Sequence, residues 1–435
     1  MLQTPNRLAV RRLGVVLCRS LLATGAVLLA FAMTPLLTKG RPSPTTALVN
    51  DARVVKALEW IDKNGAWITQ QQIKITEVPA PEFQEGPRAQ LVRKLLEGCG
   101  LKARIDSTGN VVAEYAGSAN GVLLLAAHLD TVFPAGTNVT VRQSGTRLTA
   151  PGIGDNGAGL AALLAIARAM HETKLKTHST IVFAADVGEE GEGNLRGIRA
   201  LVEHYGVNLR AVIAVDGYAT DYITTRALAS QRMEITITGS GGHSWSDFGL
   251  PNPITALSRG IVRFSGVRIP SDPRTTFNFG VIEGGTSVNS IPQSASVRLD
   301  LRSEDDSEIK RLDAAVRKAF QRGLDEELEA NGRSAPLELS YKMLGTRPGG
   351  VLPEDSPLLA AARDADRILR NSSRLEISST DANIPLSLGI PAIALGGGGD
   401  GGGAHTLQEW YEPAEREMGV KRVLLTLLGI AGVSP

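Results

Sequence analysis

Aromatic side chains and cysteines are scarce in this chain of 435 residues. Only 4% of the residues are aromatic, which gives little support for a protein that stacks nucleic-acid bases on aromatic rings. The two cysteines are Cys18 and Cys99. If the N-terminal segment that contains Cys18 is removed, no intrachain disulfide can form. We interpret Cys99, at the end of an expected helix, as a buried structural thiol.

Neither sign of charge is in clear excess, because 46 basic residues stand against 45 acidic ones. The first 32 residues carry four arginines and no acid, so the remainder of the chain has a net charge of −3 instead of +1. Such a chain has no basic surface of the kind that binds nucleic acid, and we expect no nucleic-acid partner. Its length exceeds that of a usual single core, so we expect two domains.

The N-terminal segment differs in composition from the rest. Its arginines precede an apolar run, Leu21–Phe31, and Ala30-Phe31-Ala32 fits a cleavage site. We therefore expect residues 1–32 to be a secretory signal peptide and the protein to be exported, either periplasmic or secreted. The alternative is an uncleaved membrane anchor, because the apolar character resumes through Leu37. Residues 33–50, rich in Pro, Thr and Ser, are expected to be a linker.

Apolar strands alternate with helices over residues 51–227, and the same character returns over 343–435. The unbroken apolar run Val122–Ala127 is typical of a strand buried on both faces, and Thr180–Asp186 has the same character. The pattern predicts an α/β domain with a mostly parallel sheet. Its expected helices are Arg53–Ile73, Pro87–Gly98, Leu160–His171, Asn194–Tyr205 and Glu415–Ile430, and further strands are Ala103–Asp106, Val111–Tyr115, Ala211–Val215 and Ala392–Leu395.

Residues 228–342 interrupt this domain with a different pattern. Their expected elements follow the order β-α-β-β-α-β, which is that of a ferredoxin-like α+β unit. The strands are Arg232–Thr238, Thr276–Ile282, Ser294–Arg302 and Leu337–Met343, and the helices are Pro253–Phe264 and Ser307–Asn331. We therefore expect an inserted second domain.

Polar side chains gather where the expected strands of the α/β domain end. His128 and Asp130 directly follow the first buried strand. Residues two apart in an extended chain share a face, so the Asp could hold the His in one tautomer for metal binding. The carboxyl ends of the strands are where open α/β sheets place their sites. This stretch is therefore the first candidate for a functional site.

Further candidate ligands fall along the same edge of the sheet. Asp155, Glu190, Asp216 and His405 lie in loops that follow or precede expected strands and helices. Together with His128 they are too many for one tetrahedral zinc ion and suit a pair of ions with one bridging carboxylate. Adjacent side chains diverge, so Glu189, beside Glu190, could act as a general base while its neighbour binds metal.

Taken in order, these motifs resemble the dizinc exopeptidase and deacylase family of peptidase T, the aminoacylases and the glutamate-releasing carboxypeptidases. The resemblance covers nearly all of the chain after the N-terminal segment. It implies an α/β zinc-peptidase catalytic domain with an inserted lid through which members can dimerise. The matching stretches are His128-Leu129-Asp130, Gly154-Asp155-Asn156-Gly157-Ala158-Gly159, Gly188-Glu189-Glu190-Gly191, Asp216 and Gly403-Ala404-His405.

The resemblance gives each metal ligand a role. It implies two Zn²⁺ ions per chain, with Co²⁺ or Mn²⁺ as alternatives, and Asp155 as the residue that bridges them. His128 and Asp216 complete one site, and Glu190 and His405 complete the other. The peptide bond after Asp155 is expected to be cis. An Asp at position 216 favours the peptidase T side of the family over its carboxypeptidases and deacylases.

Other residues take roles around the metals. The resemblance implies that Asp130 holds the preceding histidine and that Glu189 is the general base. In the lid, His243 of Gly241-Gly242-His243-Ser244 is expected to reach the carbonyl of the substrate, commonly in the partner subunit of a dimer. Asn289 is expected to contact substrate. Arg302 either pairs with a substrate carboxylate or forms a surface salt bridge.

We therefore predict a zinc-dependent exopeptidase that hydrolyses amide bonds of short peptides through a two-zinc-activated water and a Glu general base. An N-acyl amino acid deacylase or a carboxypeptidase of the same chemistry is the nearest alternative. A catalytically silent binding protein is a third, although all five ligands and Glu189 are present. Expected partners are a small peptide or acyl-amino acid and a second copy bound through the lid. Membrane contact requires an uncleaved N-terminal segment.

Overall fold

The structure is a computed structural model that describes residues 44–331 and 333–435. The expected signal peptide or anchor, and most of the expected linker, lie outside the described residues. The described end of that linker contains a short helix, α1 (Pro44–Leu48). Within the described ranges, no helix is both long enough and apolar enough to cross a bilayer.

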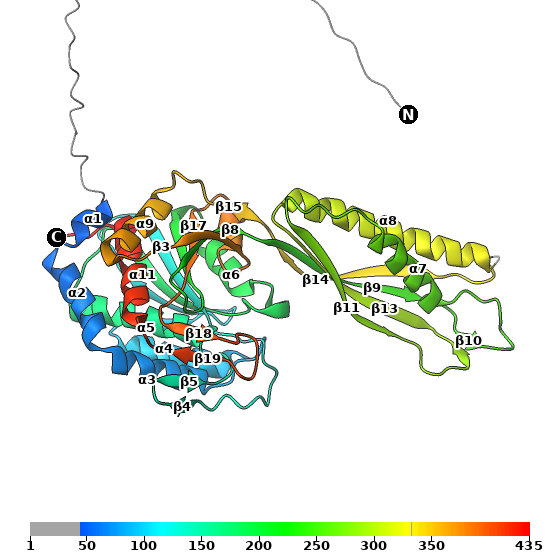
Figure 1. Ribbon diagram of the computed structural model, residues 1–435, viewed down its shortest axis with the longest axis horizontal. Coiled ribbons are helices and arrows are strands. Elements are labelled where there is room, and N and C mark those ends of the chain that lie inside the picture. Colours follow the sequence, from blue (N-terminus) through cyan, green and yellow to red (C-terminus); the bar gives the residue numbers. More distant parts are fainter. Residues whose placement is uncertain (1–43, 332) are drawn as a thin grey trace, which may run out of the picture. The chain divides into compact units, whose positions relative to one another are not determined.

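A nine-stranded sheet forms the centre of the α/β domain (Figure 1). Along the sheet the order is β1-β2-β6-β3-β7-β17-β8-β15, with β16 paired to β8. Strands β6, β3, β7 and β17 are parallel to one another, which confirms the expected mostly parallel α/β fold. The strands are β1 (Ala103–Ile105), β2 (Val111–Tyr115), β3 (Val122–His128), β6 (Thr180–Asp186), β7 (Leu209–Val215), β8 (Tyr222–Ala227), β15 (Gly350–Val351), β16 (Arg374–Ser378) and β17 (Ala392–Leu395).

Helices cover this sheet. Every residue of β3 and β6 after the first is buried, as expected for strands covered on both faces. Helix α5 is buried along almost its whole length and packs against α11 and the central strands. Cys99 is buried, as expected. The helices are α2 (Ala52–Lys63), α3 (Gly65–Thr76), α4 (Gly86–Gly98), α5 (Gly157–Glu172), α6 (Arg196–Tyr205), α9 (Pro357–Leu369), α10 (Asn383–Ser387) and α11 (Arg416–Ala431).

Two helix boundaries differ from expectation because side chains bond to the backbone. The single helix expected over Arg53–Ile73 is two helices, and the Asn64 amide that ends α2 donates to the Trp60 carbonyl at 2.7 Å. Helix α5 begins three residues early because Asn156 caps it, its amide oxygen accepting from Gly159 N at 3.1 Å.

A small antiparallel sheet lies next to the loops that carry Asp155 and His405. Its order is β18-β19-β5-β4. These short strands were not predicted from the sequence. They are β4 (Arg142–Ser144), β5 (Arg147–Thr149), β18 (Asp400–Gly402) and β19 (Trp410–Glu412).

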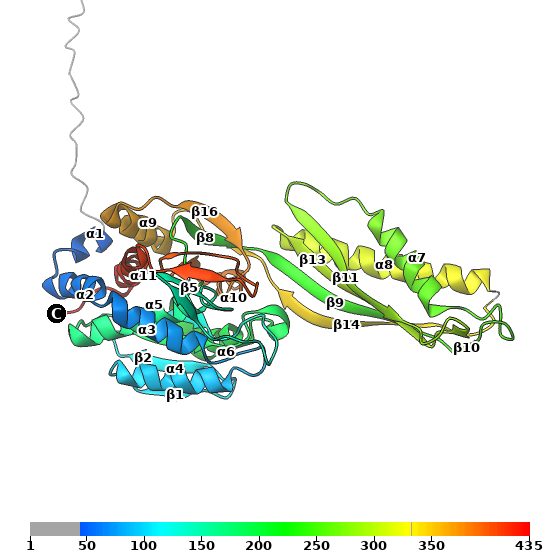
Figure 2. The ribbon, with the colours of Figure 1, turned by 60° about the horizontal axis from the view of Figure 1, so that its bottom comes forward.

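The inserted lid has the expected β-α-β-β-α-β order, with a sheet order of β11-β13-β9-β14 and antiparallel neighbours. Helices α7 and α8 cover one face of this sheet (Figures 1 and 2). Strand β14 continues to Arg347, past the expected domain boundary at residue 342. The elements are β9 (Ala229–Thr238), α7 (Pro253–Ser265), β11 (Thr275–Gly284), β13 (Ser294–Ser303), α8 (Asp306–Ala330) and β14 (Glu338–Arg347).

A two-stranded arm extends the lid. It pairs β10 (Gly242–His243) with β12 (Ser290–Ile291). The arm follows the end of the lid sheet at which Thr238 pairs with Ser294. Ten residues of β9 separate this end from the end that joins the α/β domain, a distance of roughly 30 Å along an extended strand.

Candidate metal centre

His128 is the last residue of β3, and its imidazole is buried. Its Nδ1 lies 3.1 Å from the main-chain oxygen of Asp130 and 3.7 Å from the Asp130 carboxylate. The carbonyl of Asp130, more than its carboxylate, therefore orients the ring. Burial opposes protonation, but the carboxylates of Asp155 and Asp216 raise the pKa of His128 above its ordinary value.

Asp155 lies between two histidines and offers one carboxylate oxygen to each. Its Oδ1 is 3.1 Å from His128 Nε2, and its Oδ2 is 3.1 Å from His405 Nε2. Burial alone would raise the pKa of Asp155, but the hydrogen bonds of the two histidines lower it below its usual range. A carboxylate whose two oxygens face different imidazoles has the arrangement of a bridging ligand.

The remaining predicted ligands close the cluster. Glu190 Oε1 lies 3.0 Å from His405 Nε2, and Asp216 Oδ1 lies 3.8 Å from His128 Nε2. Ligands 2.0–2.2 Å from a tetrahedral zinc ion are roughly 3.3–3.6 Å apart, and these two separations lie just below and just above that range. The structure thus brings together all five side chains that the sequence singled out, and the donor set suits two divalent ions. Their individual ligand roles stay predictions.

The loop that carries Asp155 is fixed by buried polar contacts. Glu409 accepts the main-chain N–H groups of Gly152, Gly154 and Asp155 at 2.7, 2.8 and 2.9 Å. Asn156 donates from its amide nitrogen to the carbonyl of Val215 at 2.8 Å, next to Asp216. The Asp155–Asn156 peptide bond is cis, as expected. Glu409 therefore connects the loop of Asp155 to the loop of His405.

The carboxylate of Asp130 also fixes the two neighbouring glutamates. Its Oδ1 accepts from Glu189 N at 3.0 Å, and its Oδ2 accepts from Glu190 N at 2.8 Å. The two glutamate side chains then diverge, with Glu190 directed at His405 and Glu189 at Arg347, whose Nη1 is 3.0 Å from Glu189 Oε1. Burial raises the pKa of Glu189 above its ordinary value, Arg347 opposes that rise, and Glu190 adds to it.

Two more carboxyl groups lie buried beside the cluster. Asp186 and Asp381 are both nearly inaccessible to solvent. Neither carboxylate oxygen of Asp186 receives a hydrogen bond from a described donor, and neither does Oδ1 of Asp381. Burial raises the pKa of both carboxyls, and the charge of Asp186 raises the pKa of Asp381 further. We expect the pair to hold one proton between them.

The predicted lid residues lie apart from the cluster. His243 and Asn289 are exposed on the arm and contact its own backbone. Arg302, on β13, donates to Asp300 at 2.8 Å, and 43% of its side chain is exposed. Arg302 therefore forms a surface ion pair within the lid, the second of its two expected roles, while pairing with a substrate carboxylate stays a prediction.

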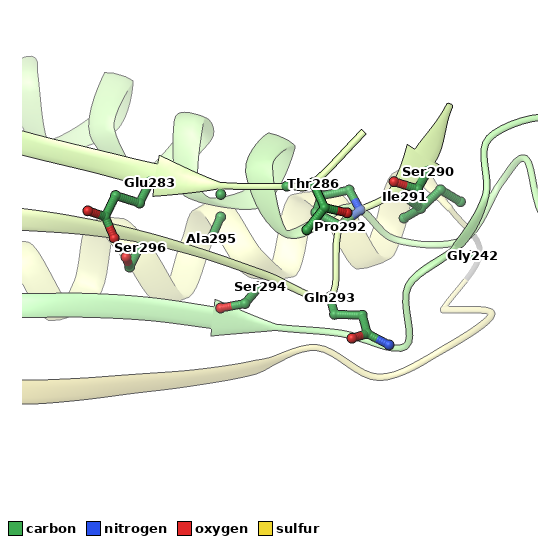
Figure 3. A pocket seen from close by; sticks show the side chains of 12 residues that line it. Gly242, Glu283, Thr286, Ser290, Ile291, Pro292, Gln293, Ser294, Ala295 and Ser296 are labelled. Atoms are coloured by element: carbon green, nitrogen blue, oxygen red, sulfur yellow. The ribbon is translucent and has the colours of Figure 1, made fainter. Parts of the chain in front are cut away.

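Two cavities differ in what they offer a ligand. One of about 610 Å³ lies beside the arm (Figure 3) and is lined by small and polar side chains around Glu283, Thr286 and Gln293, without a histidine. Another of about 280 Å³ opens directly on Asp155 and Asp216. Of these two cavities, only the smaller one is lined by members of the metal cluster, which makes it the candidate substrate cavity.

Sequence reasoning missed several residues of this site. Glu409 stands four residues after His405, a spacing that could have drawn notice. Arg347, Asp381 and Glu376 carry no motif of their own, and only the fold brings them to the cluster.

Sequence comparisons relate this chain to known proteins. The model of Peptidase family M20/M25/M40 matches residues 124–428. The uncharacterized protein YqjE of Bacillus subtilis is 24% identical over 353 residues, which is 75% of this chain and 89% of YqjE. Carboxypeptidase G2 of a Pseudomonas species is 25% identical over 227 residues, 50% of this chain and 52% of that protein.

Solved structures share the fold. A tripeptidase from Staphylococcus aureus superposes with a TM-score of 0.70 at 21% identity, covering 85% of this chain and 99% of its own. The aminopeptidase PepT of Bacillus cereus gives 0.68 at 21% identity, with the same coverage. YXEP of Bacillus subtilis, a dinuclear metal-binding peptidase, gives 0.63 at 16% identity, covering 86% and 100%. The family match spans both parts of the α/β domain and the lid between them, so the chain belongs to Peptidase family M20/M25/M40 and is a metal-binding hydrolase.

Proposed function

We propose that this protein is a two-metal exopeptidase that removes residues from short peptides. The observation that carries the proposal is Asp155, whose two oxygens each lie 3.1 Å from a different histidine while Glu189 stands beside the cluster. We propose Zn²⁺ as the native metal, with Co²⁺ or Mn²⁺ as alternatives. Two such ions would polarise the scissile carbonyl and make water a better nucleophile at neutral pH.

Glu189 would supply the proton transfers. An ionised carboxylate beside the cluster can accept the proton of the attacking water and then pass it to the departing amine. Glu190 cannot share this task while its carboxylate is directed at His405. The divergence of the two side chains therefore supports a separation of base and ligand within one dipeptide.

The cavity beside the cluster favours substrates with a free amino group. Its described lining contains Asp155, Asp216 and Glu376, together with two tyrosines, and neither lysine nor arginine. Arg374 approaches Glu376 only to 3.9 Å and is largely exposed. Bound metal would neutralise Asp155 and Asp216, which leaves Glu376 as the carboxylate of this lining that would attract the ammonium end of a short peptide and repel a carboxylate. This supports an aminopeptidase or tripeptidase over a carboxypeptidase.

The hydrogen bonds of His243 leave its Nε2 as the donor of the ring. Its Nδ1 accepts from the main-chain N–H groups of Trp245 and Ser246 at 3.2 and 3.3 Å. The neutral ring must therefore carry its proton on Nε2, which is free to donate to the oxyanion of a tetrahedral intermediate. Because the arm lies roughly 30 Å along the lid from the α/β domain, we propose that His243 serves the site of a partner subunit.

A substrate screen tests the proposed function. Zinc- or cobalt-loaded protein would be assayed on free, N-blocked and C-amidated di- and tripeptides and on acyl-amino acids, with Glu189→Gln as the inactive control. We expect cleavage of peptides with a free amino end, including the C-amidated ones. Cleavage of N-blocked peptides or acyl-amino acids alone would indicate the carboxypeptidase or deacylase alternative. Two bound metals with no hydrolysis of any compound would indicate a silent binding protein.

A further inference from the structure

We propose that Arg347 is a positioning residue for Glu189, holding its carboxylate toward the attacking water and away from the metal ligands. The proposal rests on the function assigned to Glu189 above. Arg347 lies in no sequence motif and is the last residue of the lid strand β14. It nevertheless reaches the centre of the α/β domain, where it binds the candidate base.

The contacts of Arg347 with Glu189 are double and buried. Its Nη1 donates to Glu189 Oε1 at 3.0 Å, and its Nη2 donates to the main-chain oxygen of the same residue. Nη1 also donates to Ser379 Oγ at 3.0 Å. Only 7% of the arginine side chain and 6% of the glutamate side chain are exposed. A guanidinium that binds both the carboxylate and the main-chain oxygen of the same glutamate holds that residue at two points.

Asp130 contacts only the backbone of the dipeptide, because its carboxylate accepts the N–H groups of Glu189 and Glu190. The side chain of Glu190 is held separately by His405. Among the described residues, Arg347 is the hydrogen-bond partner of the Glu189 carboxylate. Without it, the carboxylate could turn toward the cluster and compete with Glu190 as a ligand.

The origin of Arg347 links this contact to the lid. Arg347 ends β14, and its neighbour Thr346 accepts from Arg199 and donates its N–H to Asn194 Oδ1 at 2.8 Å. From β9, Arg232 donates to the carbonyl of Gly191. Residues of two lid strands therefore form hydrogen bonds with the segment that carries both glutamates. The lid cannot move at this end without changing the surroundings of Glu189.

Kinetics and metal content of Arg347→Met and Arg347→Lys, with chemical rescue of a third variant, test the proposal. Arg347→Met removes the contact, and Arg347→Lys keeps the charge but cannot span both groups of Glu189. We expect both to keep two metals and a KM within about threefold of wild type. We expect kcat to fall about 10²-fold in Arg347→Met and less in the Lys variant, since general-base catalysis is worth about 10²–10⁴. Guanidinium ion added to Arg347→Ala should restore part of kcat.

Arg298→Met is the matched control. Arg298 lies on a lid strand and also forms an ion pair with a carboxylate of the same loop, that of Glu192, but its side chain is exposed. The variant should keep normal kcat. Unchanged kcat in Arg347→Met, or loss of metal before loss of turnover, would overturn the positioning role.

Thermal unfolding separates this proposal from the proposed function. If Arg347 and Glu189 form an ion pair, Arg347→Met should lower Tm less in a Glu189→Gln background than in wild type. In that background the loss of the arginine leaves a neutral amide, and no buried carboxylate loses its partner. Equal losses of Tm in both backgrounds would overturn the contact itself. If wild type cleaves no peptide, the proposed function fails, while this comparison still decides whether Arg347 holds Glu189.

Discussion

Neighbouring residues with identical functional groups have different partners in this site, and we expect them to have different roles. Glu190 faces His405, whereas Glu189 faces Arg347, and the carboxylate of Asp130 holds the N–H groups of both. The distinction comes from tertiary contacts, since the two side chains are chemically the same. It should therefore be visible when each is replaced by its amide.

Glu189→Gln should keep both metals and still bind substrate, because the amide preserves the shape of the side chain. It should lose at least about 10²-fold in kcat, because an amide cannot accept the proton of water. Glu190→Gln should instead weaken one metal site, and excess zinc should restore part of its activity. Calorimetric metal titration and steady-state kinetics on both variants distinguish them. The reverse pattern of metal loss would exchange the two assignments.

Asp155→Ala should remove most of both metals, because its two oxygens are directed at the two histidines of the cluster. Asp216→Ala is the comparison, since Asp216 lies near only one of these histidines, and it should weaken mainly one site. Metal content after dialysis against dilute zinc measures the difference. If Asp155→Ala retains two ions with native affinity, Asp155 is not the bridge.

The buried pair of Asp186 and Asp381 should make stability depend on pH. Burial raises the pKa of Asp186 to about 7, so the folded state holds a proton that the unfolded state releases above about pH 4. This contribution to the free energy of unfolding is complete at low pH and is lost as pH rises toward 7. Asp186→Asn, which can donate to Asp381, should be stabilised relative to wild type at pH 8 and not at pH 4. Denaturant unfolding of the metal-free proteins at the two pH values checks this, and equal effects at both would contradict it.

Elements with a strong apolar pattern were predicted well. The bounds of β6 match the expected strand Thr180–Asp186, and the lid has the order read from residues 228–342. The expected ligands also converge, because carboxyl ends of parallel strands meet at one edge of a sheet. The failures are elements set by local side-chain bonds or by distant partners. Asn64 divides an expected helix, and β16 pairs with β8 across about 150 residues of sequence.

The supporting part of the site could not be predicted for the same reason. Glu409 acts on a loop more than 250 positions earlier, and Arg347 acts on a residue 158 positions earlier. The position of a single carboxylate or guanidinium in the sequence does not indicate which distant residue it binds. The ligands were recognisable because metal chemistry restricts residue type, whereas hydrogen-bonding partners to backbone groups are less restricted.

The packing of the two lid helices depends on glycines at their crossing. A Cβ on Gly323 of α8 would lie 2.5 Å from the backbone nitrogen of Gly260 in α7. Gly323→Ala should therefore push the helices apart and destabilise the lid by about 1–3 kcal/mol, despite the better helix propensity of alanine. Gly266→Ala, whose nearest neighbour lies at 3.5 Å, should be nearly neutral. Faster hydrogen exchange in α7 and α8 of the full chain would report the first effect, and unchanged exchange would contradict it.

At the scale of the whole molecule, the lid has unpartnered apolar surface on one side. Strand β11 is an edge of the lid sheet, and its residues Val281 and Ile282 are 42% and 62% exposed to solvent. On α7, Val262 is 72% exposed. An edge strand with exposed apolar side chains is a surface that a second copy can cover. This supports the proposed homodimer, in which the arm of one chain meets the metal cluster of the other.

Mixing subunits tests whether His243 acts in the partner subunit. Two differently tagged chains, one with His243→Ala and one with Glu189→Gln, would be co-expressed and the mixed dimer isolated. If His243 acts across the dimer, the His243→Ala chain keeps its own Glu189 and receives an intact His243 from its partner, so one of the two sites is complete. We expect about half of the wild-type kcat per dimer, with both parent homodimers strongly impaired. Light scattering on the wild type first tests whether the chain is a dimer. If His243 served its own chain, neither site would be complete, and the mixed dimer would be as inactive as its parents.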